Sequence, residues 1–127
     1  PINDGVIYPA EDAHWTDASW ASADERADHF VELRFAEARE VGKVAIYWSL
    51  DAGMPRTSAE VQVQVPEGEG WRTVASATPT EPAPATIIKL EAPVTAEAFR
   101  ILQPRGKGPA GRPDLMWVRE VELFGAR

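Results

Sequence analysis

The sequence predicts an all-β protein built as an antiparallel sandwich, and three observations support this prediction. The first is alternation, since segments such as residues 59–65 place apolar and polar side chains at every second position, as a half-buried strand requires. The second is turn chemistry, because 11 prolines and nine glycines fall largely between these segments. The third is the scarcity of apolar repeats with helical period. Short strands separated by turn residues are typical of a β-sandwich.

Seven segments carry the alternation expected of strands. In the closing segment, apolar Val121 and Leu123 alternate with charged Glu120 and Glu122. The predicted strands are residues 30–35, 44–48, 59–65, 71–74, 86–90, 98–102 and 117–125. Residues 18–27 lack an apolar repeat of helical period, and we expect a loop or a single turn there.

The composition is typical of one globular domain, with 127 residues, 44% hydrophobic and 26% charged. A net charge of −7 repels nucleic acid, so no nucleic-acid partner is expected. No run of roughly 18 apolar residues occurs, so we expect no membrane span. The absence of cysteine excludes disulfides and thiolate metal sites. Because the sequence starts with Pro1, we interpret residues 1–127 as a single domain excised from a larger protein.

The connections between the predicted strands differ in length in an orderly way. If each strand crosses the sandwich once, successive connections alternate between its two ends. The short connections, which would share an end with the C-terminus, are residues 37–42, 66–70 and 91–96. The long connections, which would share the other end with segment 8–29, are residues 50–58, 76–85 and 104–116. Ligands often bind to long loops held by a rigid scaffold, so we expect function at this long-loop end.

The long-loop end is expected to collect side chains that suit a sugar. Aromatic faces stack on the C–H surfaces of sugar rings, while histidine, arginine and carboxylates hydrogen-bond to hydroxyls. The candidates for ligand contact are His14, Trp15, Asp51, Arg56, Arg105, Arg112 and Trp117. The alternative is that these loops simply hold solvated charges.

Charge in one of the long loops adds a second indication. Residues 100–114 contain four cationic side chains, Arg105 and Arg112 among them, against Asp114 alone. Such a segment in an acidic chain suits an anionic ligand such as a uronic acid. The alternative is a solvated basic loop that balances nearby acids.

The tryptophans divide by position. Trp48 and Trp71 fall in predicted strands and are expected in the core. Trp15 follows a histidine in a polar segment and is the best candidate for an exposed ring. Trp117 lies between a long loop and a strand, so it suits either place.

The sequence contains few of the residues that a catalytic site would need. The chain has two histidines, His14 and His29, and no cysteine, so the usual catalytic triads and zinc sets lack parts. The adjacent carboxylates Glu11 and Asp12 cannot flank a glycosidic bond from opposite sides. Carboxylates distant in sequence still leave a small hydrolase as an alternative, but we expect no enzyme activity.

Taken together, the segments resemble the discoidin or coagulation factor V/VIII C-type domain, and most of all the family 32 carbohydrate-binding modules. The segments that carry the resemblance are residues 3–5, 20–22, 29–35, 44–48, 61–65, 70–74 and 119–125. The resemblance implies a β-sandwich jelly roll of the galactose-binding type and a bacterial extracellular or cell-surface location. Galactose-binding members commonly have a histidine where this chain has Ala21, so galactose specificity is not expected.

The resemblance also implies one structural calcium ion, which members often hold between the first loop and the closing strand. The matching positions are Asp4 and Glu120, whose carboxylates suit this cation. The family usually has threonine or serine where this chain has Ala18. The alternative is that Asp4 caps a turn while Glu120 pairs with an arginine.

The sequence therefore favours a non-catalytic carbohydrate-binding module, an accessory domain of a secreted bacterial polysaccharide-degrading enzyme. The alternative is a structural or protein-interaction domain that packs against a catalytic neighbour in the same chain and binds no sugar. That alternative predicts an exposed apolar patch on the isolated domain.

Overall fold

The computed structural model describes residues 5–7, 15–22 and 26–125. The described strands are β1 (Gly5–Ile7), β2 (Trp15–Ala21), β3 (His29–Trp48), β4 (Leu50–Asp51), β5 (Met54–Pro55), β6 (Val61–Glu67), β7 (Gly70–Ala77), β8 (Ala85–Gln103) and β9 (Trp117–Phe124). None of the described residues belongs to a helix that could cross a bilayer. The predicted all-β class is confirmed.

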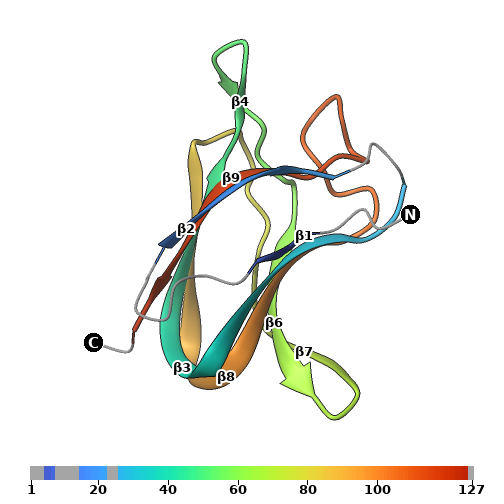
Figure 1. Cartoon of the computed structure of the whole chain (residues 1–127). Coiled ribbons are helices and arrows are strands. Elements are labelled where there is room, and N and C mark those ends of the chain that lie inside the picture. The colour runs from blue at the N-terminus through green and yellow to red at the C-terminus, as the bar shows by residue number, and fades with distance from the viewer. Residues whose placement is uncertain (1–4, 8–14, 23–25, 126–127) are drawn as a thin grey trace.

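Two long strands, β3 and β8, connect the layers of the sandwich. Neighbouring strands follow the order β2-β9-β3-β8-β6-β7, and β1 pairs with β3 in parallel. The first part of β3 pairs with β1 and the end of β8, whereas its last part pairs with β9 and the start of β8. Register shifts between Arg34 and Arg39 and between Val41 and Lys43 allow the strand pair to bend. Figure 1 shows this bend at the bottom of the molecule. The result is the predicted antiparallel β-sandwich jelly roll.

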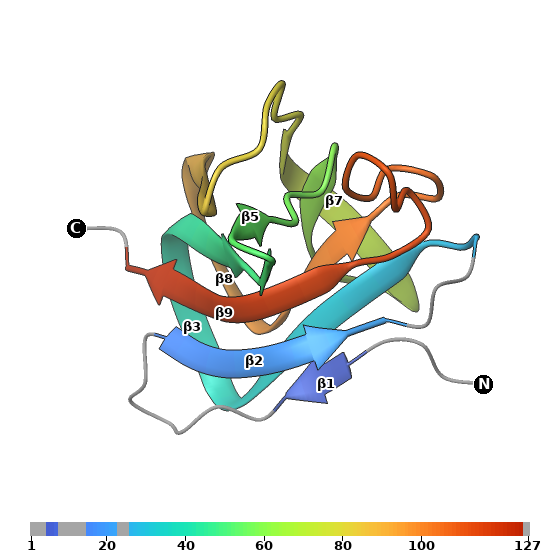
Figure 2. The ribbon, with the colours of Figure 1, turned by 90° about the horizontal axis from the view of Figure 1, so that it is seen from above.

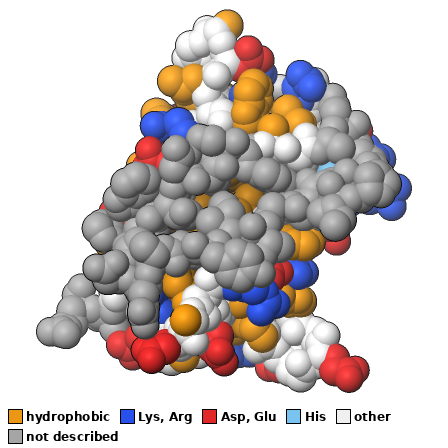
Figure 3. Space-filling model, viewed as in Figure 1, with side chains coloured by type: hydrophobic (Ala, Val, Ile, Leu, Met, Phe, Trp, Pro, Cys, Tyr) orange, Lys and Arg blue, Asp and Glu red, His pale blue; other side chains and the backbone are white. Residues whose placement is uncertain are grey.

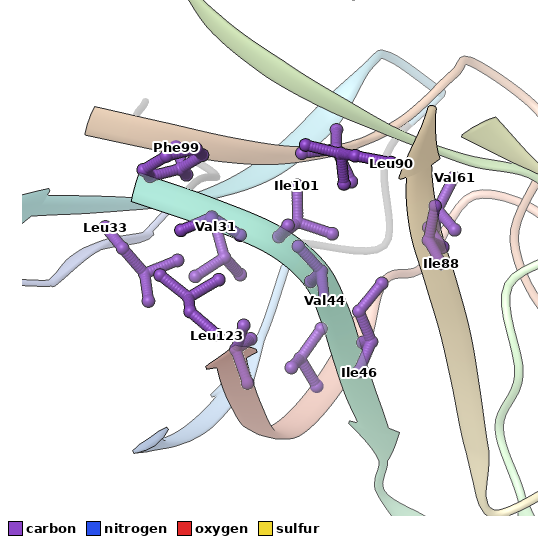
Figure 4. Packing of buried hydrophobic residues seen from close by; sticks show 14 of the residues in the cluster. Val31, Leu33, Val44, Ile46, Val61, Ile88, Leu90, Phe99, Ile101 and Leu123 are labelled. Atoms are coloured by element: carbon purple, nitrogen blue, oxygen red, sulfur yellow. The ribbon is translucent and has the colours of Figure 1, made fainter. Parts of the chain in front are cut away.

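The core lies between the two layers and draws side chains from both. The alternating valines of β6, Val61, Val63 and Val65, are all buried, as the sequence pattern predicted. They belong to the same cluster as Val121 and Leu123 of β9. Figure 4 shows this packing from close by. Trp48 is fully buried, as predicted, and its Nε1 donates to Thr86 Oγ1 at 2.8 Å.

Two expectations about connections are wrong. Residues 37–42 and 91–96 are not loops but parts of β3 and β8, because the two strands stay paired through the bend. The alternation fails there because residues 36–38 and 91–93 are all exposed, so neither face is marked as apolar. Residues 15–21 form β2 on the edge of β9 rather than a loop or turn. A register shift between Asp17 and Trp20 interrupts the period of β2, which hides the strand from a pattern search.

Trp71 is not a core residue, contrary to expectation. Its ring is half-buried and lies outside the core cluster, with the Arg100 guanidinium 3.9 Å from its centroid. The same guanidinium lies 3.7 Å from the Phe30 ring centroid, so Arg100 sits between two aromatic rings. Arg100 Nη2 also contacts Glu32 Oε1 at 2.7 Å, and Glu32 is nearly fully buried. Arg100 is therefore part of the sheet rather than of a basic loop.

Candidate functional site

The three long connections meet at one end of the sandwich, as predicted from their lengths. Figure 1 shows them at the top of the molecule, and Figure 2 shows them from above. Hydrogen bonds join them directly, because Thr57 Oγ1 donates to Ala83 O at 2.7 Å and Ala59 N donates to Lys107 O at 2.8 Å. The loop that follows β5 therefore connects the other two.

A buried polar network fixes the 104–116 loop on the strands beneath it. Gln103, which is fully buried, donates from Nε2 to Leu115 O at 3.0 Å and accepts from the Ser58 hydroxyl. His29 Nε2 lies 3.0 Å from Asp114 O. Because each buried polar group that loses its partner costs free energy, these contacts hold the loop in one conformation.

Gly108 makes the loop fold back tightly. A Cβ at this position would lie 2.5 Å from Leu115 O, 2.6 Å from Arg112 O and 2.7 Å from Pro113 O. These distances are shorter than carbon and oxygen atoms tolerate, and the atoms are backbone, so only glycine fits without a shift. The glycine brings the two sides of the loop together beside the ends of the other two loops.

A cleft forms where the three loops meet. Its main hollow, of about 250 Å³, is lined by residues 57–59, 79–82, 108–111 and 113. A smaller hollow of about 120 Å³ shares Thr57, Pro82, Pro109 and Ala110 with it and adds Met54, Pro55 and Arg56. We call the two together the three-loop cleft. Its walls are mostly prolines, small residues and backbone, together with the side chains of Met54, Arg56 and Glu81.

Asp51 and Arg56 come together at the border of the cleft, as a sugar site at this end would need. Arg56 Nη2 lies 2.8 Å from Asp51 Oδ2, and both side chains are partly exposed. The β4–β5 hairpin makes this contact possible through Ala52 and Gly53, which both have positive φ, 53° and 81°. Arg56 Nε is buried and has no hydrogen-bond acceptor among the described residues. The pair thus offers a cation, a carboxylate and an unused donor.

Trp117 borders a separate open hollow at the same end. Ser49, Leu50, Trp117 and Arg119 line this space, which measures about 530 Å³. Trp117 is half-buried, and its carbonyl accepts a hydrogen bond from Ser49 N at 3.2 Å. It shares no lining residue with the three-loop cleft.

Tyr47 lies on β3 next to this part of β9. Its hydroxyl donates to Glu122 Oε1 at 2.9 Å. This hydrogen bond, then burial and the negative charges of Glu122 and Glu120, raise the pKa of Tyr47 above its ordinary value of 10.0, while Arg119 lowers it. The phenol is therefore a hydrogen-bond donor to its carboxylate partner at neutral pH.

Arg105 and Arg112 lie on the 104–116 loop but do not line the cleft. Both are exposed. Arg105 N donates to Asp28 Oδ1 at 2.8 Å, and Arg112 N donates to Pro109 O at 2.9 Å. Their side chains remain candidates for contact with a ligand that extends beyond the cleft.

Trp15 does not lie where the sequence predicted it. This residue begins β2 opposite Glu122, whereas Ala21 at the end of β2 is opposite Trp117. The expectation that Trp15 lies in a loop at the long-loop end is therefore wrong, because β2 carries it toward the other end of β9. Its contact with a ligand stays a prediction, and the site described below does not use it. His14 lies outside the described residues.

Of the two residues predicted to bind calcium, the structure describes Glu120, whereas Asp4 lies outside the described residues. Glu120 Oε1 lies 3.5 Å from Arg119 Nη1, the contact that the alternative interpretation expected. The described residues contain no group of three or more histidine, aspartate or glutamate side chains placed to hold a metal. Calcium binding stays a prediction.

Sequence reasoning missed several of the residues that line the cleft. Thr57, Ser58, Pro82 and Gly108 were not candidates, because none carries a charge or an aromatic ring. The available signal was the concentration of proline in residues 79–84 and of glycine in residues 106–111. Such segments mark loops with fixed backbone shapes, which can line a site without contributing charge.

Comparison with known families places this fold and site in context. Residues 6–114 match the family model described as the F5/8 type C domain. The chain therefore belongs to the F5/8 type C domain family, which confirms the predicted resemblance. A comparison with curated proteins found no match.

Solved structures with the same fold include carbohydrate-binding modules. One is CBM32-5 of the Clostridium perfringens protein CpGH89, in complex with GalNAc-β-1,3-galactose, with a TM-score of 0.67 and 14% identity over 84% of this chain and 74% of that one. Another is chitosan-binding module 1 of a Paenibacillus chitosanase/glucanase, with a TM-score of 0.59 and 19% identity over 84% and 75% of the two chains. A third is a putative α-L-fucosidase from Bacteroides thetaiotaomicron, with a TM-score of 0.61 and 20% identity. There the match covers 84% of this chain but 22% of the fucosidase.

Proposed function

We propose that this F5/8 type C domain is a non-catalytic carbohydrate-binding module that binds sugar at its long-loop end. Its place would be an accessory domain of a secreted or surface-bound bacterial enzyme that degrades polysaccharides. The fold match that covers 22% of a putative fucosidase supports such a place, since there a similar domain is part of a longer chain.

The convergence of three long loops on one bordered cleft is the observation that carries the proposal. Carbohydrate sites need a hollow of fixed shape with a few directed polar groups. The network around Gln103 and the turn at Gly108 supply the fixed shape. Arg56 and Asp51 supply donor and acceptor at the border.

The orphaned donor of Arg56 strengthens the assignment. A buried N–H without an acceptor costs about 1–3 kcal/mol. Arg56 Nε is in that state beside the cleft. A sugar hydroxyl would remove the cost by accepting from this group, once the hairpin yields enough to admit it. The nearby Asp51 carboxylate would accept from a second hydroxyl.

Trp117 would extend the site along β9. Part of its surface is accessible beside Ser49 and Arg119, a combination that allows stacking on one sugar ring and hydrogen bonds to its hydroxyls. Arg105 and Arg112 would contact more distant residues of an oligosaccharide. A calcium ion bound through Asp4 and Glu120 would act on stability rather than on sugar contact.

A glycan array followed by calorimetry tests the proposal. We expect weak, reversible binding to at least one plant, algal or host glycan, and about a tenfold or greater loss with Arg56→Ala, since hydrogen bonds to charged groups contribute about 1.5–3 kcal/mol. Arg72→Ala is the matched control, because Arg72 lies on β7, away from the long loops, and pairs with Glu67 at 2.9 Å. Absence of binding to every glycan tested would count heavily against a carbohydrate-binding module.

A second candidate function rests on exposed apolar side chains. Leu50 is 56% and Met54 54% exposed, both on the β4–β5 hairpin. Figure 3 shows hydrophobic and charged side chains together over this upper end. Such side chains suit a domain that packs against a catalytic neighbour without binding sugar. Fusion to that neighbour should then shield the hairpin from limited proteolysis, which sugar binding alone would not do.

A further inference from the structure

A second hollow lies at the end of the sandwich opposite the long loops. It measures about 400 Å³, within the range of roughly 300–1,000 Å³ common for small-molecule sites. It is lined by residues at the bend of β3 and β8 and by the end of β9. Figure 1 shows the bend at the bottom of the molecule and the end of β9 at the lower left. Its lining is residues 42–43, 89–91, 93 and 124–125. None of these residues lines the three-loop cleft.

Two lysines face each other across the strands that form this hollow. Lys43 of β3 is directly opposite Lys89 of β8 in the antiparallel register. Like charges at directly opposed positions destabilise a sheet, because their Cβ atoms are only about 4.5–5.5 Å apart. The arrangement is therefore unfavourable unless something offsets the repulsion.

Phe124 fixes one of the two charges. Lys43 is also opposite Phe124 of β9, and its Nζ lies 4.3 Å from the centroid of that ring. A cation over an aromatic face is held by the ring quadrupole, so the ammonium has a defined position at the wall of the hollow. The neighbouring Gly125 leaves open space beside the ring, since a Cβ added there would lie 4.0 Å from its nearest contact, Glu40 O.

Neither lysine has a counter-ion among the residues that the structure describes. Among the described residues, carboxylates pair with Arg26, Arg34, Arg56, Arg72, Arg100 and Arg119, whereas no salt bridge involves Lys43 or Lys89. This holds in a chain with 20 acidic residues and a net charge of −7. Glu91 lines the same hollow but is exposed and makes no salt bridge within the described part of the chain, so the lining carries two positive charges against one negative.

We propose that this hollow binds an anionic group carried by a saccharide, a carboxylate or a sulfate ester. The anion would lie between the Lys43 and Lys89 ammonium groups, remove their repulsion and place its sugar ring over Pro93 and Gly125. The proposal is independent of the long-loop end, because the two hollows lie at opposite ends of the domain.

Amide NMR titration of the whole domain tests the site. The probes are a galacturonate disaccharide, galactose 6-sulfate and inorganic sulfate, with neutral galactobiose as the uncharged control. We expect saturable shifts at Lys43, Lys89, Phe124 and Gly125 with the charged sugars, and none there with galactobiose. A response to the galacturonate alone or to the sulfate ester alone identifies which anion the site takes. Shifts spread evenly over all cationic residues, or produced by inorganic sulfate as strongly as by both sugars, overturn the saccharide site.

Substitutions then separate the site from general charge attraction. Lys89→Ala and Lys43→Ala should each weaken the charged sugar about fivefold, since one close ion pair near the surface contributes up to about 1 kcal/mol. Arg72→Ala lowers the net charge equally on the other layer and should leave affinity within about twofold, in low salt where surface charges act most strongly. Equal losses in the lysine variants and in Arg72→Ala would refute the assignment. Failure here would leave neutral-sugar binding at the long-loop end untouched.

Discussion

Replacement of Gln103 by leucine should destabilise the domain by about 2–4 kcal/mol. The side chain is fully buried and serves two partners, Leu115 O at 3.0 Å and the Ser58 hydroxyl. Leucine keeps a similar volume but leaves a buried carbonyl and a buried hydroxyl unpaired, at about 1–3 kcal/mol each. Part of that cost is offset because the Ser58 hydroxyl can rotate and because leucine is apolar. Urea unfolding followed by tryptophan fluorescence measures the change.

Gln64→Leu is the matched control, since Gln64 is half-buried and its hydrogen bonds to Gln62 and Thr73 are long, 3.2 Å each. It should change stability by no more than about 0.5 kcal/mol. In the double variant of Gln103→Leu with Ser58→Ala the hydroxyl is removed too, so the cost should be less than the sum of the single changes. Strict additivity, or a Gln103→Leu variant as stable as the parent, would refute the network that fixes the loop.

Two further predictions concern the sheet faces. Arg100→Ala should lower the free energy of unfolding in urea by about 2–4 kcal/mol, because the buried Glu32 carboxylate loses one of its arginine partners and two cation–π contacts disappear. A decrease below about 1 kcal/mol would contradict this reasoning. The phenol of Tyr47 should titrate above 10.0 by ultraviolet absorbance, and Glu122→Gln should lower that pKa. Because the pKa of Tyr47 is raised in the folded protein, the stability that this phenol contributes is present below pH 10.0 and is lost as the pH rises through its pKa in the folded state. A titration of Tyr47 at 10.0 would contradict the hydrogen bond to Glu122.

The sequence was sufficient to predict those parts of the fold in which local pattern and tertiary role agree. In β6 and β9, strict alternation coincides with one buried face, so strand and core residues were both predictable. At the bend of β3 and β8 the alternation stops while pairing continues, because both faces are exposed there. Alternation also does not say which face is inward, and Trp71 was therefore assigned to the wrong one.

The site was predictable in position more than in composition. Loop lengths predicted that the long connections meet at one end, where the cleft lies, and Asp51 and Arg56 are close enough in sequence for a hairpin to bring them together. The supporting contact between Ser58 and Gln103 spans 45 positions, so no local pattern reveals it. Trp15 was misplaced for a similar reason, since only the distant partner β9 makes its segment a strand.

Mapping of a bound neutral oligosaccharide by amide NMR is the most direct test of the central proposal. With a glycan identified on the array, the largest shifts should fall on residues 49–60, 78–84 and 104–117. Arg56→Ala should abolish or strongly reduce them, while Arg72→Ala should leave them unchanged. Shifts confined to the outer faces of the sheets or to the opposite end, with the three long loops unaffected, would contradict a carbohydrate site at the long-loop end.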